Sequence, residues 1–384
     1  MKFTNENSTL TLYFEGELNS YNAESIDKDI EQTLANQKFM KLVLDFARLV
    51  YISSAGLRVI LKLKQKYQDV TVVEVSLEVY DIFSMTGFTN IMEIKKGLKK
   101  IDLTGAEIIG DGYFSTVYRI DKDTIIKVFN KTSDIGQIER ELKLAKLAFV
   151  LGIPTAISFD IVKVNDDKLG VRFEMLDCMS LQSVFIKRER LDEYVDKYAS
   201  LLKKMNTTES LDPTIPDMKA NFLTKYQRLE QWLPKDRYEQ IKKMLETIPN
   251  RQTLIHGDCH FKNIFVQKDE LLLIDMDTLS IGYPIFELAA LHFAYVALNE
   301  DEADNSMKFF KISREEAYEL YDGLIDRYFG KDNQAIKDKI AMISYIHVLF
   351  WNRKNELNNQ ARFESVKDRL YKLLDQYQDF DIGV

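Results

Sequence analysis

The chain has 384 residues, of which 46% are hydrophobic and 29% are charged, and its formal net charge is −8. This composition is ordinary for a soluble globular protein, and the length predicts two or three domains. The negative charge argues against a nucleic-acid partner, because a phosphate backbone attracts basic surfaces. Two cysteines exclude a disulfide framework, and four histidines leave little room for a zinc site.

The sequence predicts neither a targeting segment nor a membrane segment. The N-terminal stretch MKFTNENSTLTLYF becomes polar early and lacks the apolar core of a signal peptide. No stretch approaches the roughly twenty apolar residues that a membrane-spanning helix needs. We therefore expect a cytoplasmic protein with no membrane partner.

The N-terminal part of the chain alternates between strand and helix patterns. Residues 8–15 alternate apolar and polar side chains, which predicts a strand, and the apolar residues of the next segment recur at helical spacing. The predicted elements are strand, helix, strand, helix, strand and helix, at residues 8–15, 23–34, 40–46, 53–63, 69–75 and 79–85. This alternation predicts a small α/β domain over residues 1–98, ending where Gly97 and neighbouring lysines interrupt the pattern.

The rest of the chain predicts a second, larger domain over residues 104–384. It begins with a strand, a glycine-containing turn and two further strands, followed by a helix at about 134–150. Two more strands end near Met175. From Leu181 onward the pattern is mostly helical, apart from a loop-and-strand segment at 253–283.

A glycine-containing turn opens the second domain. The segment IIGDGYFSTVYRI places Gly110 and Gly112 between two predicted strands, with Ser115 where a third glycine would stand. Glycines in such a turn let backbone amides approach a triphosphate that a side chain would obstruct. Ordinary hairpins use the same pattern, so the turn indicates a nucleotide site only together with other residues.

Lys127 places a charge inside the apolar run DTIIKVFN. It is either a surface lysine on an edge strand or a lysine that holds the α- and β-phosphates of a nucleotide. Glu141 lies one turn before Ala145 on the core-facing stripe of the following helix. A carboxylate on such a stripe needs a cationic partner, so we expect an ion pair between Lys127 and Glu141.

The segments TLIHGDCHFKNIFV and LLLIDMDTLS carry the strongest signal. Asp258 and Asn263 are five residues apart in a short loop, and Asp275 ends the next apolar strand. Magnesium prefers hard oxygen ligands, which Asn263 and Asp275 would supply, while Asp258 would act as base on an acceptor hydroxyl. Aspartate and asparagine also favour turns. The ordered set of motifs, however, predicts an ATP- and magnesium-dependent phosphotransferase.

The motifs HGDCHFKN at 256–263 and IDMD at 274–277 resemble the catalytic and metal-binding motifs of the aminoglycoside phosphotransferase and choline kinase family. The resemblance implies a bilobal, protein-kinase-like phosphotransferase domain with ATP between its lobes. The N-lobe would cover about 104–176 and a helical C-lobe about 177–384.

The same resemblance assigns roles residue by residue. Asp258 would be the catalytic base, and Asn263 and Asp275 would be the metal ligands. Lys127 and Glu141 would form the ion pair that positions the phosphates. The backbone near Met175 and Leu176 would bind adenine.

Three positions depart from the family pattern or extend it. Glu287 stands where the family usually has an aspartate that braces the catalytic loop. Lys262 replaces a residue that is usually small or neutral, which favours an anionic acceptor. Asp277 is either a ligand of a second metal ion or a solvated carboxylate.

The N-terminal segment SSAGLRVILKLK resembles a STAS domain of the anti-sigma-factor-antagonist type. This resemblance implies a protein partner and makes Ser54 a candidate phosphorylation site, whereas the usual preceding aspartate is Ser53. The alternative is that the serine only caps the helix, since its oxygen accepts a free helix N–H.

Two functional hypotheses follow. The first is an enzyme that transfers the γ-phosphoryl group of ATP to the hydroxyl of a small molecule, with the STAS domain as a sensor or docking module. The second is a signalling kinase that phosphorylates protein serine, including Ser54 of its own STAS domain. A third hypothesis, an inactive nucleotide-binding scaffold, conflicts with the complete set of catalytic residues.

Overall fold

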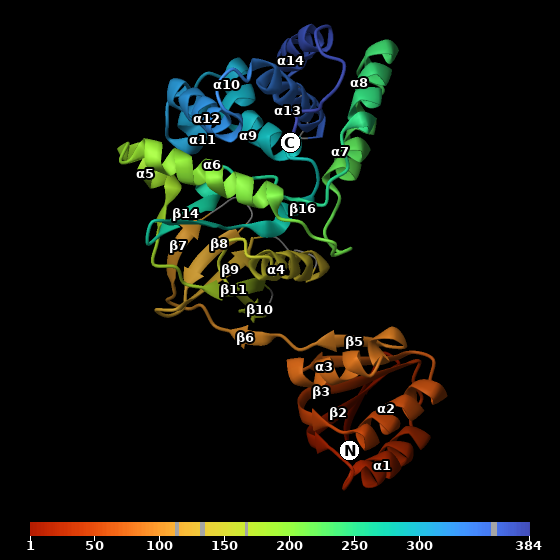
Figure 1. Ribbon diagram of the computed structural model, residues 1–384. Helices are drawn as coiled ribbons and strands as arrows, with labels where there is room; N and C mark the ends of the chain where they lie inside the picture. Colours follow the sequence, from red (N-terminus) through yellow and green to blue (C-terminus); the bar gives the residue numbers. More distant parts are fainter. Residues whose placement is uncertain (112–114, 131–134, 166–167, 355–358) are drawn as a thin grey trace. The chain divides into compact units, whose positions relative to one another are not determined.

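The computed structural model describes residues 1–111, 115–130, 135–165, 168–354 and 359–384, without the side chains of 353 and 354. Residue contacts divide the chain into two compact units. One comprises Met1–Thr104 and Ile161–Leu169, and the other comprises Gly105–Asp160 and Gly170–Val384 (Figure 1). Within the described ranges, no helix combines the length and the apolar character that crossing a membrane requires.

The first unit is built on a five-stranded sheet in the order β1-β2-β3-β4-β5. Strands β1 and β2 are antiparallel, and β2, β3, β4 and β5 run parallel. Its elements are β1 (Lys2–Glu6), β2 (Thr9–Leu18), α1 (Ala23–Ala35), β3 (Lys41–Ile52), α2 (Ser54–Lys66), β4 (Val70–Val75), α3 (Leu77–Met85) and β5 (Glu93–Lys96).

Alternating apolar residues form the core of this unit. Over the first six residues of β2 and of β3 every second side chain is buried, as in Leu10, Leu12, Leu42 and Leu44, which are 0% exposed. The predicted strands and helices are all present. Strand β1 was not predicted, because its sequence KFTNE is exposed throughout and carries no apolar pattern.

A six-stranded sheet follows, in the order β6-β10-β11-β9-β8-β7. Its strands and the helix inserted between β9 and β10 are β6 (Lys99–Ile101), β7 (Glu107–Asp111), β8 (Ser115–Arg119), β9 (Thr124–Phe129), α4 (Ile135–Val150), β10 (Ser158–Val164) and β11 (Lys168–Glu174). Buried residues of α4, including Leu144 and Ala148, join one core with the helices that follow in the chain. The expected helix at about 134–150 therefore forms as predicted.

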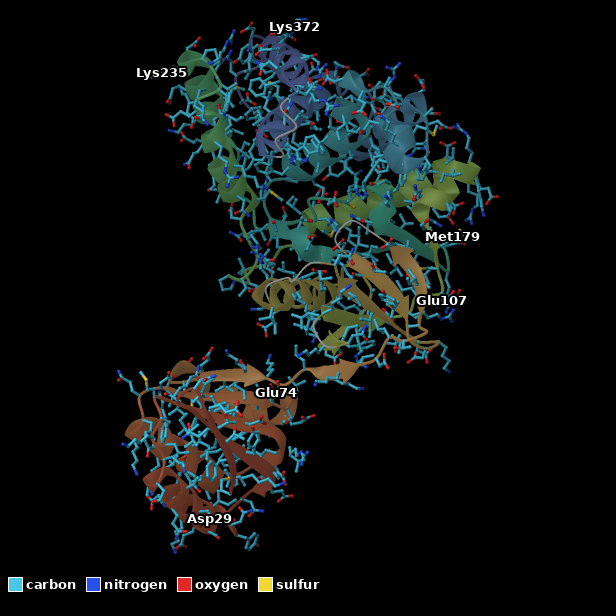
Figure 2. All side chains as sticks on the ribbon, turned by 180° about the vertical axis from the view of Figure 1, so that it is seen from behind. Asp29, Glu74, Glu107, Met179, Lys235 and Lys372 are labelled. Atoms are coloured by element: carbon cyan, nitrogen blue, oxygen red, sulfur yellow. The ribbon has the colours of Figure 1, made fainter. Side chains whose placement is uncertain are left out.

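The C-terminal part is mostly helical. Its helices of seven or more residues are α5 (Leu181–Lys187), α6 (Leu191–Thr207), α7 (Met218–Tyr226), α8 (Lys235–Thr247), α9 (Ile285–His292), α12 (Arg314–Phe329), α13 (Gln334–Lys354) and α14 (Gln360–Leu374). Helix α8 lies beside α14, where Arg237 and Asp375 form an ion pair of 2.7 Å. Figure 2 shows Lys235 and Lys372 of these two helices at the surface.

Short strands interrupt the helices where the sequence predicts a loop-and-strand segment. Strands β12 (Met179–Ser180), β14 (Ile264–Gln267) and β15 (Glu270–Leu273) form one small sheet, and β13 (Leu254–Ile255) pairs with β16 (Ser280–Ile281). The loop between β13 and β14 carries Asp258 and Asn263. The segment between β15 and β16 carries Asp275. The pairing of β14 with β15 and of β13 with β16 therefore brings the segments that carry Asp258, Asn263 and Asp275 close together.

Candidate active site

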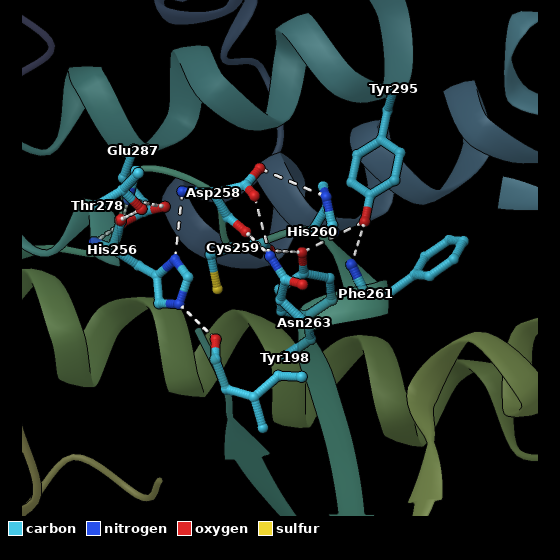
Figure 3. Close-up of polar contacts among 12 residues, drawn as sticks. Tyr198, His256, Asp258, Cys259, His260, Phe261, Asn263, Thr278, Glu287 and Tyr295 are labelled. Atoms are coloured by element: carbon cyan, nitrogen blue, oxygen red, sulfur yellow. Dashed lines mark hydrogen bonds and ion pairs between the residues drawn. The ribbon is translucent and has the colours of Figure 1, made fainter. Parts of the chain in front are cut away.

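The loop between β13 and β14 presents Asp258 and Asn263 together (Figure 3). The Asn263 side-chain amide donates to the Asp258 backbone oxygen at 2.9 Å and to the Asp258 carboxylate at 3.0 Å. His260 Nε2 lies 3.4 Å from the other oxygen of that carboxylate. Gly257 turns the loop with φ +80°, a conformation that L side chains rarely adopt.

The electrostatics of the loop favour a proton acceptor. Desolvation raises the pKa of Asp258 to about 6, with a further rise from Asp275, whereas His256 and Asn263 oppose it. Burial lowers the pKa of His260 to about 4. At neutral pH the Asp258 carboxylate is therefore ionised and close to its titration range, and His260 is neutral.

Buried groups brace the start of the loop. Glu287, at the beginning of α9, is fully buried and accepts from the His256 amide at 2.5 Å and from the Gly257 amide at 3.3 Å. Burial raises the pKa of Glu287 to about 7. His256 Nδ1 accepts from the Asp258 amide at 3.2 Å, which assigns the proton to Nε2 beside the Ile274 oxygen at 3.1 Å. The longer side chain of glutamate thus reaches the loop that the family aspartate would brace.

Two buried tyrosines hold the second half of the loop. The Tyr295 hydroxyl accepts from the Phe261 amide at 2.8 Å, and the Tyr198 hydroxyl donates to the Cys259 oxygen. The two hydroxyls lie 3.4 Å apart. Tyr198 comes from α6, and Tyr295 comes from a π-helical segment, Phe293–Ala297, that follows α9. Sequence analysis did not identify either tyrosine, because an aromatic residue on a helix stripe indicates core packing.

Lys127 joins the two halves of the candidate site. Its amine lies 2.8 Å from Glu141 and 2.9 Å from Asp275, and the lysine side chain is only 17% exposed. Burial alone would lower the pKa of Lys127, but the charges of Asp275 and Glu141 hold it above its ordinary value. The predicted ion pair with Glu141 is present, and Asp275 is a second partner that the sequence did not predict.

Carboxylates gather around Lys127. Asp275 adopts a left-handed backbone with φ +66°, which is uncommon outside glycine. Desolvation and then the charge of Asp275 raise the pKa of Asp277 to about 7. In the described ranges, no three His, Cys, Asp or Glu residues form a cluster that would hold a metal by themselves. Magnesium typically takes one or two carboxylates plus phosphate oxygens, so Asn263 and Asp275 fit it only when a nucleotide supplies the other ligands.

The remaining predicted nucleotide contacts lie at the glycine-containing turn and after β11. Gly110 lies in β7 and Ser115 begins β8, whereas Gly112 falls outside the described residues. The Met175 amide donates to the Asp123 oxygen at 2.8 Å. In the part of the chain that the structure describes, the Leu176 amide has no such partner, so of the two predicted adenine contacts Leu176 is the one whose backbone N–H is not already bonded.

In the first unit, the helix cap differs from the expectation. Ser53, and not Ser54, caps α2, and its hydroxyl accepts from the Gly56 amide at 3.4 Å. Ser54 is the first residue of the helix and is exposed. The interpretation that Ser54 serves as the cap is therefore wrong. The Ser54 hydroxyl does not cap the helix.

Family comparisons match both parts of the chain. The STAS domain matches residues 1–101, and the phosphotransferase enzyme family matches residues 105–320. BtrV of Bordetella bronchiseptica, whose name describes an anti-sigma factor antagonist, is 34% identical over 84 residues, covering 21% of this chain and 72% of that protein.

Solved structures that match this chain have low sequence identity to it. A choline/ethanolamine kinase family protein from Mesorhizobium loti is 12% identical, covers 70% of this chain and 91% of its own, and has a TM-score of 0.46. A thermostable mutant of aminoglycoside phosphotransferase APH(4)-Ia is 10% identical, with coverages of 71% and 94% and a TM-score of 0.49.

Proposed function

The chain belongs to the phosphotransferase enzyme family, and we propose that it transfers the γ-phosphoryl group of ATP to a hydroxyl group of a small molecule. The observation that carries this proposal is the position of Lys127, bound at 2.8 Å to Glu141 and at 2.9 Å to Asp275. A buried lysine between two carboxylates, beside the Asp258 loop, is suited to orient phosphates next to a base. The proposal divides the chain into a STAS domain at residues 1–98 and a phosphotransferase domain at residues 104–384.

Nucleotide and metal would be held by residues of both halves of the site. Lys127, positioned by Glu141, would contact the α- and β-phosphates, and the Leu176 amide would receive adenine. Asn263 keeps its side-chain oxygen for a metal ion, because its amide nitrogen already donates to Asp258. When bound with Asn263 and Asp275, magnesium would neutralise charge on the phosphates.

Asp258 would accept the proton in the chemical step. The acceptor hydroxyl loses its proton to the Asp258 carboxylate, and its oxygen forms a bond to the γ-phosphorus. The bond from that phosphorus to the bridging oxygen breaks, and ADP leaves with the electron pair. The Asn263 amide and His260 fix the carboxylate in its position. Glu287, Tyr198 and Tyr295 hold the loop that carries it.

A turnover screen tests this proposal. ATP consumption is measured with alcohols, sugars, amines and the protein itself as acceptors, in wild type and Asp258→Asn. Loss of the base should lower turnover by about 10²–10⁴-fold while ATP binding is retained. Equal turnover in both proteins would contradict the role of Asp258.

A second candidate function is phosphorylation of protein serine, with Ser54 as acceptor. The exposure of Ser54 and the capping of α2 by Ser53 favour it, because the Ser54 hydroxyl is not used by the helix. A phosphate at this helix terminus would meet free N–H groups and would change the surface offered to a protein partner.

Mass spectrometry separates the two functions. Wild type, Ser54→Ala and Asp258→Asn are each incubated with ATP and magnesium, and their peptides are analysed. Phosphate on Ser54 in wild type but not in Asp258→Asn would support self-modification. An unmodified Ser54 after many turnovers on another acceptor would exclude it.

A further inference from the structure

Lys262 occupies a central position in the catalytic loop. It follows Asp258 by four residues, directly precedes Asn263, and lies on the short 3-10 helix Phe261–Asn263. The loop is fixed on both sides of it, by the bond from the Phe261 amide to Tyr295 and by the bonds from Asn263 to Asp258. The backbone from which the Lys262 side chain extends is therefore held in place beside the proposed base.

The Lys262 amine lies over the face of an aromatic ring. It is 4.1 Å from the ring centroid of Phe309, a residue of α11 (Asn305–Phe310) that is 49% exposed. Phe309 in turn packs edge-to-face on His260, with ring centroids 5.8 Å apart. Within the described ranges, no carboxylate forms an ion pair with Lys262.

A second lysine, Lys311, follows Phe309 by two residues and so belongs to the segment that contacts Lys262. Lys311 directly follows α11 in a left-handed conformation with φ 63°, and its amine donates to the Lys308 backbone oxygen at 3.2 Å. Burial, and after it the positive charge of Lys311, lowers the pKa of Lys262. Like Lys262, Lys311 forms no ion pair with a described carboxylate.

The neighbouring acids are already bound to other cations. Lys308 of α11 lies 2.7 Å from Glu302 and 3.1 Å from Asp304. The same Glu302 also binds Arg362 at 3.0 Å. The structure thus pairs Lys308 with two acids, whereas Lys262 and Lys311 have no ion-pair partner among the described carboxylates.

The positive charges of Lys262 and Lys311 repel each other, and an anion bound by both would relieve that repulsion. Asp258 is the carboxylate that attracts Lys262, but the transfer reaction requires it as a proton acceptor. Resting on the proposed function, we propose that the acceptor is a small molecule that carries an anionic group, phosphate or carboxylate, in addition to its reacting hydroxyl. Lys262 and Lys311 bind that group, and a polycationic acceptor would be repelled.

Another role for Lys262 makes a different prediction. If its charge acted on the phosphoryl group in transfer, removing it would lower kcat for every acceptor. If its charge binds the anionic group of the acceptor, removing it raises KM for anionic acceptors and leaves neutral acceptors unchanged. The two roles are therefore distinguished by kinetics alone.

The experiment compares small hydroxyl-bearing acceptors that differ in charge. Turnover of ATP is measured with glycerol 3-phosphate, glycerate, glycerol and choline, in wild type, Lys262→Gln, Lys311→Gln and the double variant. Lys308→Gln is the control, since Lys308 is a lysine of the same segment with its own acidic partners. We expect an anionic preference in wild type and a rise of about 10- to 100-fold in KM for the anions in the double variant. Comparison of glycerol 3-phosphate with glycerate shows whether the site binds a phosphate or a carboxylate group.

Calorimetry provides a second readout that does not require turnover. Wild type and the double variant are titrated with glycerol 3-phosphate and glycerate in the presence of ADP and magnesium. Anion binding in wild type and its loss in the double variant would support the proposal. No binding of either anion, equal preference for neutral or cationic acceptors, or a uniform loss of kcat would overturn it. Failure to bind ATP with magnesium would instead overturn the proposed function.

Discussion

Replacing Lys127 with methionine removes the cation from a nearly buried cluster while keeping its apolar volume. Glu141, whose side chain is 11% exposed, would lose its ion-pair partner, whereas Asp275 at 38% exposure remains partly solvated. Breaking a buried ion pair from one side costs about 3–5 kcal/mol. Because Lys127 retains 17% exposure, we expect a loss near the lower limit, about 3 kcal/mol in the free energy of unfolding.

The double variant Lys127→Met/Glu141→Gln should recover most of that loss, since no buried charge is left unpaired, but it should remain inactive. Unfolding in urea is followed by tryptophan fluorescence, which reports on the second unit because both tryptophans, Trp232 and Trp351, lie in it. A double variant as unstable as the single one would show that the unpaired charge of Glu141 is not the cause of the loss.

A matched control for Lys127 is Lys337, which also has two carboxylate partners. They are Asp322 at 2.6 Å and Asp326 at 3.4 Å, with 58% and 39% of their side chains exposed. Solvated ion pairs contribute about 0–1 kcal/mol, so Lys337→Met should have a small effect. Equal losses in the two lysine variants would show that burial is not the cause.

Two further predictions concern the catalytic loop. Because Asp258 must be ionised and its pKa is raised to about 6, kcat/KM should be constant above that pH and fall tenfold per unit below it; a profile that is flat down to pH 4.5 would contradict the assignment. Tyr295→Phe leaves the Phe261 amide without its acceptor. It should therefore lower kcat, and it should lower the free energy of unfolding by about 1–3 kcal/mol. Tyr226→Phe, which removes an equally buried hydroxyl bonded to Tyr238, should lower stability without lowering kcat; equal kcat losses would show that Tyr295 has no special role.

Much of the architecture could be predicted from local patterns. The match to the phosphotransferase enzyme family confirms the predicted enzyme class, and with the STAS match it confirms the predicted fold class. The helix carrying Glu141 has a clear apolar period, and the strand carrying Lys127 is a short apolar run. Their ion pair was predictable because a carboxylate on a core-facing stripe needs a cation.

The contacts that sequence analysis missed join distant elements. Tyr198 and Tyr295 meet the loop from α6 and from the segment after α9, and nothing in their local pattern distinguishes them from core aromatics. The cap of α2 was displaced by one residue, since two consecutive serines are equally good caps by composition. The contact of Lys262 with Phe309 joins segments whose relative position only the fold determines.

The most direct test of the account is the affinity for ATP with and without magnesium, measured by calorimetry in wild type and Asp275→Ala. If Asp275 and Asn263 hold a metal ion together with the phosphates, wild type binds ATP tightly only with magnesium. In Asp275→Ala, the affinity for ATP should then be nearly the same with and without magnesium. Tight binding of ATP in excess chelator, or an unchanged magnesium dependence in Asp275→Ala, would contradict the account.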